Sequence, residues 1–360
     1  MGIATVCEIV VVVKDQLAMT RRCVEAITAR TKVLYRLIII DNASNDETRT
    51  YLKKLNRDRD DVTLIRNEEN VGWVKGVNQG IGVSLAGFVC FMNNDAIVRT
   101  DGWLARLIAI SHSEPNIGLV NPTFEVKNEG FVFDKPFVEL DFCRGYCMLV
   151  KRSVIDTIGA LDTAYGLGYY DDDDYSVRAI RAGFLCVRAR DVFVEHVKDS
   201  TFRSLFKEEK RRYLHERNKL LFYSKWGRRL RILFVISGDS SKKHDFAGLF
   251  FSLARSQHLI YAWNVKERLG LKHINIRETV YTPTTLSIAL FIKIILNKVK
   301  KRTKQFDAIF VEEGVVREIF LGPRKKIHRF NISRKRSIFD VISALHEKSK
   351  AESARLLERL

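Results

Sequence analysis

Four consecutive aspartates, Asp171 to Asp174, occupy the stretch YYDDDDYSVR at residues 169–178 of a 360-residue chain whose formal net charge is +18. Crowding of carboxylates raises the pKa of at least one of them, which makes it a better proton acceptor. Asp174 lies four residues before Arg178, a spacing at which opposite charges stabilise a helix. The run is therefore predicted to supply a general base, with a solvated acidic turn as the alternative and Asp173 expected to be exposed.

Polar residues also stand directly after two apolar runs. Asp41 follows RLIII at 36–40, and Asn93-Asn94-Asp95 follows FVCFM at 88–92. In open parallel sheets, ligands gather at the carboxyl ends of the strands. We therefore predict that Asp41 and Asp95 are functional, although Asp41 could instead form an Asx turn.

Strands and helices are expected to alternate in the first half of the chain. Continuous β-branched and apolar runs are typical of strands buried on both faces, and they occupy residues 7–14, 36–42, 62–65 and 88–92. Amphipathic stripes between them predict helices, one of which begins at a capping box, Ser44 to Glu47. This alternation predicts an α/β fold with a mostly parallel sheet flanked by helices.

Composition narrows the functional classes. The length favours two domains, and no apolar stretch reaches the 18 residues that a spanning helix needs. The apolar start lacks a basic leader, so no signal peptide is expected.

The six cysteines lie in apolar runs without a Cys-x-x-Cys pair, which predicts buried, reduced thiols in a cytoplasmic protein. A pI of about 9.7 indicates an anionic partner, but no nucleic-acid-binding module is present, so nucleic acid is not expected.

Several motifs occur in an order that resembles the family-2 glycosyltransferases. They are IIIDNASNDET (38–48), NEENVGWVKGVNQGI (67–81), FMNNDAIV (91–98), GYCMLVKRSVIDTIGALD (145–162), YYDDDDYSVRAIRAGF (169–184) and a lone His196. The resemblance covers residues 7 to 200. It implies the GT-A nucleotide-sugar-binding fold and, in the pattern of rhamnosyl- and galactofuranosyl-transferases, an inverting reaction.

The resemblance also implies roles for individual residues. Asp172 matches the general base, and Asp95 and His196 match the ligands of Mn²⁺ or Mg²⁺. The nucleotide-binding positions are Asp41, Asn70, Gly72, Asn78 and Asn94, and acceptor-side candidates are Trp73, Tyr146 and Asp171. The family's DxD motif has Asn93 in place of its first aspartate, so this metal site is expected to depend on His196 or on the bound nucleotide.

The second half predicts another, smaller α/β domain. Strands are expected at 229–237, 258–263 and 306–313, and helices at 246–255 and 284–302. Residues 229–320 resemble the N-terminal lobe of a GT-B glycosyltransferase, a Rossmann-like fold. The 284–302 helix has a basic end and could lie at a membrane interface or be buried in the domain. A helical tail follows, which could dock on the domain or pair with another chain. The predicted domains are 1–226, 227–333 and 334–360.

Together these features predict an inverting, metal-dependent glycosyltransferase. It would move a sugar from a UDP-, dTDP- or GDP-linked donor to a glycan or lipid-linked acceptor, as in surface polysaccharide biosynthesis. It would be cytoplasmic, with peripheral contact at the inner face of the membrane through its basic second half. The alternative is a non-catalytic glycosyltransferase-like module that binds glycan, membrane or a partner enzyme.

Overall fold

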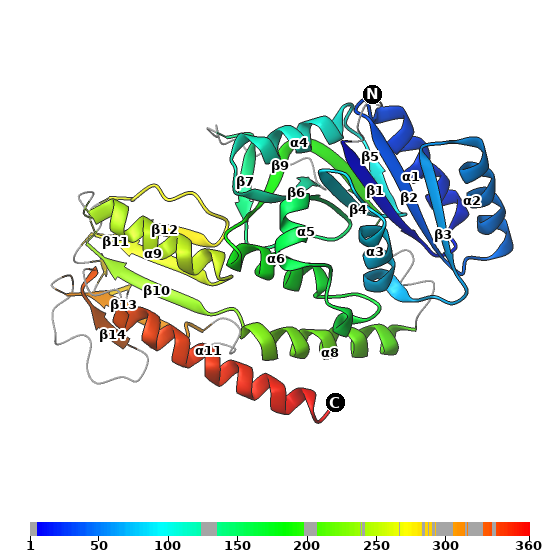
Figure 1. Cartoon of the computed structure of the whole chain (residues 1–360). Coiled ribbons are helices and arrows are strands. Elements are labelled where there is room, and N and C mark those ends of the chain that lie inside the picture. Colours follow the sequence, from blue (N-terminus) through cyan, green and yellow to red (C-terminus); the bar gives the residue numbers. More distant parts are fainter. Residues whose placement is uncertain are drawn as a thin grey trace. The chain divides into compact units, whose positions relative to one another are not determined.

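A computed structural model of the chain divides into two compact units, Met1–Lys219 and Leu220–Leu360 (Figure 1). The boundary falls inside helix α8 (Glu208–Trp226). The structure describes residues 6–123, 135–197, 207–237, 239, 242–265, 267–282, 285–286, 288–289, 292, 305–313, 315, 327–332 and 336–360. No helix of these described residues is long and apolar enough to cross a membrane.

The first unit is built on a nine-stranded sheet in the order β3-β2-β1-β4-β8-β6-β9-β5, with β7 paired to β9. The first four strands along the chain are parallel, and they are β1 (Cys7–Val13), β2 (Tyr35–Asn42), β3 (Val62–Asn67) and β4 (Phe88–Asn93). The predicted strands are thereby confirmed. Strand β8 (Cys147–Lys151) runs antiparallel to β4 and to β6 (Ile117–Thr123). Strand β9 (Leu185–His196) is parallel to β6, so it ends at the same edge as β1 to β4.

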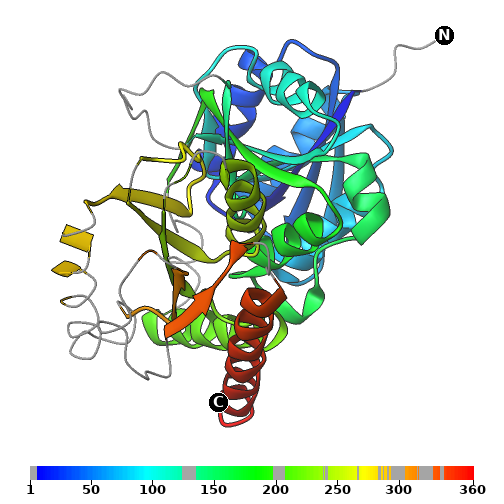
Figure 2. The ribbon, with the colours of Figure 1, turned by 90° about the vertical axis from the view of Figure 1, so that its left-hand side faces the viewer.

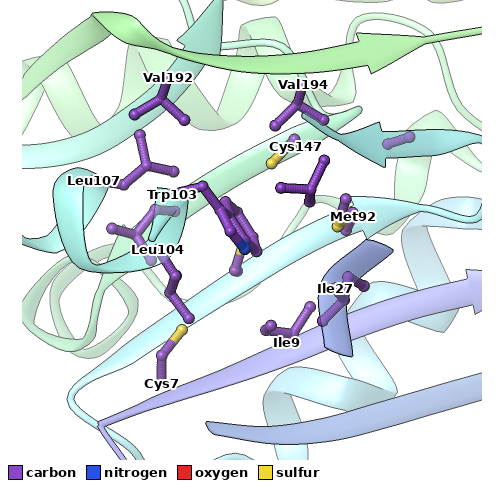
Figure 3. Close-up of a cluster of buried hydrophobic side chains, with 14 of the residues drawn as sticks. Cys7, Ile9, Ile27, Met92, Trp103, Leu104, Leu107, Cys147, Val192 and Val194 are labelled. Atoms are coloured by element: carbon purple, nitrogen blue, oxygen red, sulfur yellow. The ribbon is translucent and has the colours of Figure 1, made fainter. Parts of the chain in front are cut away.

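Both faces of the first sheet are buried. Alternate residues of β1, such as Ile9 and Val11, enter one apolar core, to which α1 (Leu17–Arg30) and α4 (Trp103–Ser113) contribute. Figure 3 shows Trp103 within this cluster. On the other face α3 (Gly72–Gly82) packs against β1, and its Gly80 faces Val10 so closely that a Cβ there would lie 2.3 Å from a valine methyl. This close packing fixes the helix that begins at Gly72.

The remaining elements of the first unit connect and cover the sheet. They are α2 (Asp46–Asp58), β5 (Ala96–Val98), β7 (Phe137–Leu140), α5 (Arg152–Ile158), a 3-10 turn at Thr163–Tyr165 and α6 (Asp171–Arg181). The predicted cap of α2 is wrong by one residue. Asn45, not Ser44, is the N-cap, and its side chain accepts the backbone N–H of Thr48 at 3.0 Å. Ser44 instead accepts the backbone N–H of Asp15 at 2.9 Å, because the loops after β1 and β2 lie together.

The cysteines agree with the sequence-based expectation. All six are buried and none forms a disulfide. Burial raises the pKa of thiols such as Cys23, since the thiolate would lose its hydration. These side chains therefore act as small apolar groups in the core of the first unit.

The second unit contains a five-stranded parallel sheet in the order β12-β11-β10-β13-β14. Its strands are β10 (Arg231–Ile236), β11 (Leu259–Asn264), β12 (Ile276–Val280), β13 (Ala308–Glu312) and β14 (Ile327–Phe330). The order reverses direction between β10 and β13, as in doubly wound folds. Alternate residues of β10 enter two separate apolar clusters, so this sheet is also covered on both faces.

Helices α9 (Lys243–Arg255) and α11 (Arg336–Leu357) also belong to the second unit, and α11 is a single continuous helix (Figure 2). Of the two fates predicted for the tail, the structure shows docking. The stripe of Ile338, Val341, Ile342 and Leu345 packs on the apolar cluster of β10 and α9. Most of the helix predicted at 284–302, including its basic end, lies outside the described residues, and the three-domain division remains a prediction.

Candidate active site

A cavity of about 530 Å³ opens at the carboxyl edge of the first sheet. Strands β1 and β4 reach it at Val12 and Asn93, and α6 borders it through Asp171 to Asp173. Most of the predicted site residues line it, namely Asn70, Gly72, Trp73, Asn94, Asp95, Tyr146, Asp171, Asp172 and His196. Segments far apart in the sequence therefore meet around one space.

Asp95 and His196 are brought together by strand pairing. The residue after Asp95, Ala96, begins β5, and it pairs directly with His196 at the end of β9. The His196 Nε2 lies 3.4 Å from the Asp95 Oδ1 and 3.3 Å from the Asn93 amide nitrogen. The Tyr146 ring stacks on the imidazole, with centroids 4.9 Å apart. The predicted pair is thus adjacent, with Asp95 buried and His196 partly buried against the Tyr146 ring.

Asp172 is oriented by backbone groups. One carboxylate oxygen accepts the Gly145 N–H at 2.9 Å, and the other accepts the Asp173 N–H at 3.1 Å. Burial raises the pKa of Asp172, while these N–H groups and the charge of Arg144 act in the opposite direction. A carboxylate with a raised pKa is a better proton acceptor than a free aspartate.

The neighbouring carboxylates share this environment. Burial raises the pKa of Asp171 well above its usual range, and the charge of Asp172 adds to the effect. The Trp73 side chain donates a hydrogen bond to Asp171, which favours the ionised form. Burial and the charges of Asp172 and Asp171 raise the pKa of Asp173 as well. The expectation that Asp173 is exposed is wrong, because it is partly buried and lines the cavity.

Asp174 has the structural role predicted for it. Its carboxylate lies 2.9 Å from the Arg178 Nε, one helical turn later, and also accepts the Tyr165 hydroxyl at 3.2 Å. Arg178 in turn donates to the carbonyl oxygens of Ile158 and Ala160. The pair ties α6 to the loop that precedes it.

Gly72 is required by the close approach of that loop. Its φ of +84° is a left-handed conformation that favours glycine, and a Cβ there would lie 2.9 Å from Leu167 Cδ2 and 3.0 Å from Leu167 Cα. The Asn70 side chain accepts the Gly72 N–H at 3.0 Å, and the Asn42 amide donates to the Gly72 carbonyl at 3.1 Å. These contacts fix the start of α3 at the edge of the cavity.

Two of the predicted nucleotide-binding residues do not line the cavity. Asp41 is fully buried, forms an ion pair with Arg66 and accepts the Ser44 N–H, three residues on, at 2.9 Å, a local structural role like the Asx turn considered as its alternative. Asn78 exchanges two hydrogen bonds with the backbone of Leu161, at 2.8 and 3.0 Å. In the structure both side chains hold loops in place.

Sequence reasoning missed several residues of the site. Lys14, Arg144, Tyr170 and His215 all line the cavity. Lys14 follows directly after β1, and this position at a strand end was an available signal. His215 lies 19 residues beyond His196, on α8, and nothing in the motif order indicated it.

A family model described as "Glycosyl transferase family 2" matches residues 8–137, the part of the chain that carries β1 to β4 and the Asn93-Asn94-Asp95 turn. The first unit contains a family-2 glycosyltransferase domain. The match ends before Asp172 and His196, so the assignment of those two residues rests on the cavity geometry and on the motif order. This family-2 domain has the GT-A type of fold, a large mostly parallel sheet flanked by helices.

Two curated relatives come from Haloferax volcanii. The glycosyltransferase AglE is 22% identical over 203 residues, which cover 52% of this chain and 66% of the relative. The low-salt glycan biosynthesis hexosyltransferase Agl10 is 24% identical over 223 residues, or 54% of this chain and 68% of the relative. An uncharacterized protein of Sinorhizobium fredii is 22% identical over 49% of this chain, but that match spans only 23% of its own length.

Among solved structures, the mannosyltransferase PcManGT of Pyrobaculum calidifontis, in complex with GDP-Man and Mn²⁺, resembles the chain with a TM-score of 0.50. The two are 16% identical over 62% of this chain and 64% of the other. At this identity the likeness supports the fold alone. What the family-2 domain of this chain does must be argued from its own residues.

A divalent cation fits the donor set at Asp95 and His196. Within the described residues no group of three or more His, Cys, Asp or Glu side chains forms a cage. Mg²⁺ is commonly held by one or two protein ligands together with the phosphates of a substrate, and imidazole suits Mn²⁺. A carboxylate and an imidazole 3.4 Å apart therefore suit a metal that binds with a nucleotide diphosphate.

Proposed function

We propose that the first unit is an inverting glycosyltransferase that moves a sugar from a nucleotide-diphosphate donor to a hydroxyl of an acceptor. The observation that carries the proposal is the meeting of Asp172 with Asp95 and His196 around one cavity at the carboxyl edge of the sheet. This reaction needs a carboxylate that can accept a proton and groups that can hold a metal ion, and a partly buried Asp172 shares its cavity with Asp95 and His196. A module that only binds glycan has no use for both.

The donor binds at the strand ends. The nucleotide diphosphate lies near Lys14, Asn70, Gly72 and Asn94, where the start of α3 and the ends of β1 and β4 provide polar groups. Lys14 donates to the Ala43 carbonyl at 2.8 Å and pairs with Asp15 at 3.1 Å, and these contacts hold its ammonium at the cavity where the diphosphate would bind. Asp41 reaches the base only if it exchanges its ion pair with Arg66 for the ligand.

The acceptor hydroxyl binds at Asp172. As the oxygen attacks the anomeric carbon, the bond to the nucleotide diphosphate breaks, and the hydroxyl proton passes to the Asp172 carboxylate. The N–H groups of Gly145 and Asp173 hold that carboxylate in position throughout. Attack on the face opposite the leaving group inverts the anomeric configuration without a covalent intermediate.

Asp95 and His196 would hold a divalent cation, Mn²⁺ or Mg²⁺, which supplies charge stabilisation for the departing diphosphate. The Tyr146 ring keeps the imidazole in place, and the Tyr146 hydroxyl is itself anchored on the Pro122 carbonyl at 3.1 Å. Asn93 contributes an amide instead of a second carboxylate, so the metal affinity without nucleotide is expected to be low.

The acceptor is proposed to be a glycan or a lipid-linked glycan. One relative of this family-2 domain is a hexosyltransferase of glycan biosynthesis, and the chain's net charge of +18 favours anionic surfaces such as lipid head groups. A cytoplasmic enzyme at the inner face of a membrane, acting in surface polysaccharide biosynthesis, is consistent with both.

Turnover of a nucleotide-sugar panel tests the proposal. UDP-, dTDP- and GDP-sugars are incubated with Mn²⁺, and nucleotide release is measured for the wild type, for Asp172→Asn and for Asp156→Asn, an exposed aspartate on α5. Loss of the general base should reduce turnover by about 10²- to 10⁴-fold. The Asp156 variant should match the wild type. Equal activity in all three proteins would remove Asp172 from the base role.

Thermal shift in the same samples separates the non-catalytic alternative, which Asn93 in the DxD position favours. Stabilisation by a nucleotide sugar together with measurable release supports the enzyme. Stabilisation without release by any donor, with or without metal, would support a binding module instead. Asp95→Asn and His196→Ala should remove the part of the shift that depends on Mn²⁺.

A further inference from the structure

We propose that Tyr169, Tyr170 and His215 form an aromatic subsite for a sugar ring of the acceptor, and that the buried Asn218 is the positioning residue that keeps this subsite open. The inference rests on the proposed function and names the residues that recognise its acceptor. All four residues belong to the first unit.

The backbone of the two tyrosines is unusual. Tyr169 has a φ of +71° and Tyr170 a φ of +65°, a left-handed conformation that is costly for residues other than glycine. Two such residues in succession persist only where the surrounding structure holds them, and such strain gathers at functional sites. Both tyrosines line the cavity, immediately before the acidic start of α6.

Asn218 supplies the restraint from α8. It is fully buried, and its side-chain amide donates to the carbonyl oxygens of Tyr165, Gly168 and Tyr169, at 2.8, 2.7 and 3.2 Å. These carbonyls belong to the turn that forces the following backbone into the left-handed region. A single buried amide therefore restrains the backbone that carries the two tyrosines.

His215 lies one turn earlier on α8 and contributes a third ring to the same wall of the cavity. Its centroid is 5.5 Å from the Tyr169 ring, in an edge-to-face arrangement, and 5.4 Å from the Tyr170 ring. Residues three apart lie on one face of a helix. The same face of α8 thus fixes the loop through Asn218 and completes the aromatic group through His215.

The place of this group favours the acceptor over the donor. His196 of the proposed metal-ligand pair stacks on Tyr146, and the adjacent Gly145 donates to Asp172. Tyr170 directly precedes Asp171, so the aromatic group lies beside the proposed base, while the strand ends serve the nucleotide.

Ring faces beside carboxylates suit a sugar in particular. A pyranose or furanose presents apolar C–H groups to an aromatic face, and its hydroxyls donate to carboxylates at the edge. Asp171 and Asp173 provide such acceptors next to Tyr170. A nucleobase would use the rings but has fewer donors for this acidic edge.

The test uses the full chain and a panel of octyl glycosides of common hexoses and deoxyhexoses as acceptor probes. Binding is measured by saturation-transfer NMR, and kinetics are measured with the best donor. His215→Leu and Tyr170→Leu should raise the acceptor KM by about 10-fold, as expected for the loss of one good ring contact. The donor KM should rise much less than the acceptor KM. Tyr213→Leu, which removes an exposed tyrosine of the same helix, is the matched control.

Asn218→Ala should raise the acceptor KM and also lower kcat, because the loop leads directly into Asp172. Adding Tyr169→Gly to that variant should restore much of kcat, since glycine adopts a positive φ without cost. The acceptor KM should stay high, because a ring is lost. A residue needed only for folding would not show this separation.

Three results would overturn the inference. They are the failure of every glycoside to bind the wild type, an unchanged acceptor KM in His215→Leu and Tyr170→Leu, and a rise in the donor KM instead, which would place a nucleobase on the rings. Donor turnover or nucleotide-dependent thermal stabilisation in the same proteins would leave the glycosyltransferase proposal standing in each case.

Discussion

The contact between Gly72 and Leu167 can be tested by adding one methyl group. Gly72→Ala introduces a Cβ at a φ of +84°, where it would lie 2.9 Å from a side-chain carbon and 3.0 Å from the Cα of Leu167. The second of these atoms is backbone, so it cannot rotate away. The loop that carries Leu167 must shift, and this loop leads through Tyr169 and Tyr170 to Asp171.

The expected cost has two parts. A left-handed conformation costs an alanine about 1–2 kcal/mol relative to glycine, and overpacking of a fitted contact costs about 1–3 kcal/mol. Gly72→Ala should therefore lower the free energy of unfolding by about 2–5 kcal/mol. For a unit of this size, each 1 kcal/mol corresponds to about 2–4 °C in Tm.

Two other glycines of α3 serve as controls. A Cβ at Gly82 meets nothing within 4 Å, so Gly82→Ala should be neutral or slightly stabilising. A Cβ at Gly80 would lie 2.3 Å from a Val10 methyl, away from the residues that line the cavity. Gly80→Ala should therefore lose stability and keep its turnover below the transition temperature. Urea unfolding and nucleotide release are measured on the wild type and on the three variants.

The reasoning predicts that Gly72→Ala alone loses both stability and turnover. If it were as stable as Gly82→Ala, the close contact with Leu167 would be wrong. If it lost stability as Gly80→Ala does but kept full turnover, the loop position would not control the site. Only the combined loss supports the proposed link between the start of α3 and the acidic run.

The remaining predictions concern charge and hydrogen bonding. Asp173→Asn should raise Tm by a few degrees at pH 8 but not at pH 4. The pKa of Asp173 is raised in the folded state, so the ionised carboxylate destabilises the fold as the pH rises through that pKa. Equal Tm differences between variant and wild type at both pH values would contradict this. Arg66→Met should cost about 3 kcal/mol by leaving the Asp41 carboxylate buried without its cation, and Asp41→Asn in the same chain should recover most of that in urea unfolding. Asn78→Ala should cost about 1–3 kcal/mol through its two bonds to Leu161, and its donor KM, measured in parallel, would rise only if the side chain also contacts nucleotide.

The strands of the first unit were predictable because both faces of its sheet are covered. A strand buried on both sides must be apolar throughout, and CEIVVVV at Cys7–Val13 and the run within Tyr35–Asn42 show this directly. Short elements gave no such signal. The three-residue β5 is too short for a periodic pattern, yet its pairing with β9 places Asp95 beside His196.

The cap of α2 shows why boundaries are harder to predict than elements. Ser44 and Asn45 are both good N-cap residues, and local sequence cannot choose between them. The choice is made by Asp15, whose backbone N–H donates to the Ser44 hydroxyl oxygen and whose carboxylate accepts the Asn45 N–H at 2.7 Å. A partner 29 residues away therefore decides a local detail.

The same argument explains which parts of the site escaped sequence reasoning. The motifs singled out the groups proposed to act on substrate, such as Asp172, but not the buried amides that orient them. The Asn121 side chain donates to the carbonyl oxygens of Arg144 and Cys147 at 2.9 and 2.6 Å and accepts the Arg144 N–H at 2.6 Å. It thereby fixes the peptide group between Arg144 and Gly145, and the N–H of that group donates to the Asp172 carboxylate.

Buried amides recur around this cavity because its walls are loops. The partly buried Asn78 and the buried Asn121 and Asn218 each bond backbone groups from another segment, and each compensates for hydrogen bonds that a loop cannot make with itself. Their partners are main-chain atoms, so no side-chain pattern reports the pairing. In sequence such an asparagine looks the same as one in a surface turn. The proposed base, Asp172, is thus oriented by residues that only a three-dimensional structure can reveal, which is why a motif could single out Asp172 but not the orientation of its carboxylate.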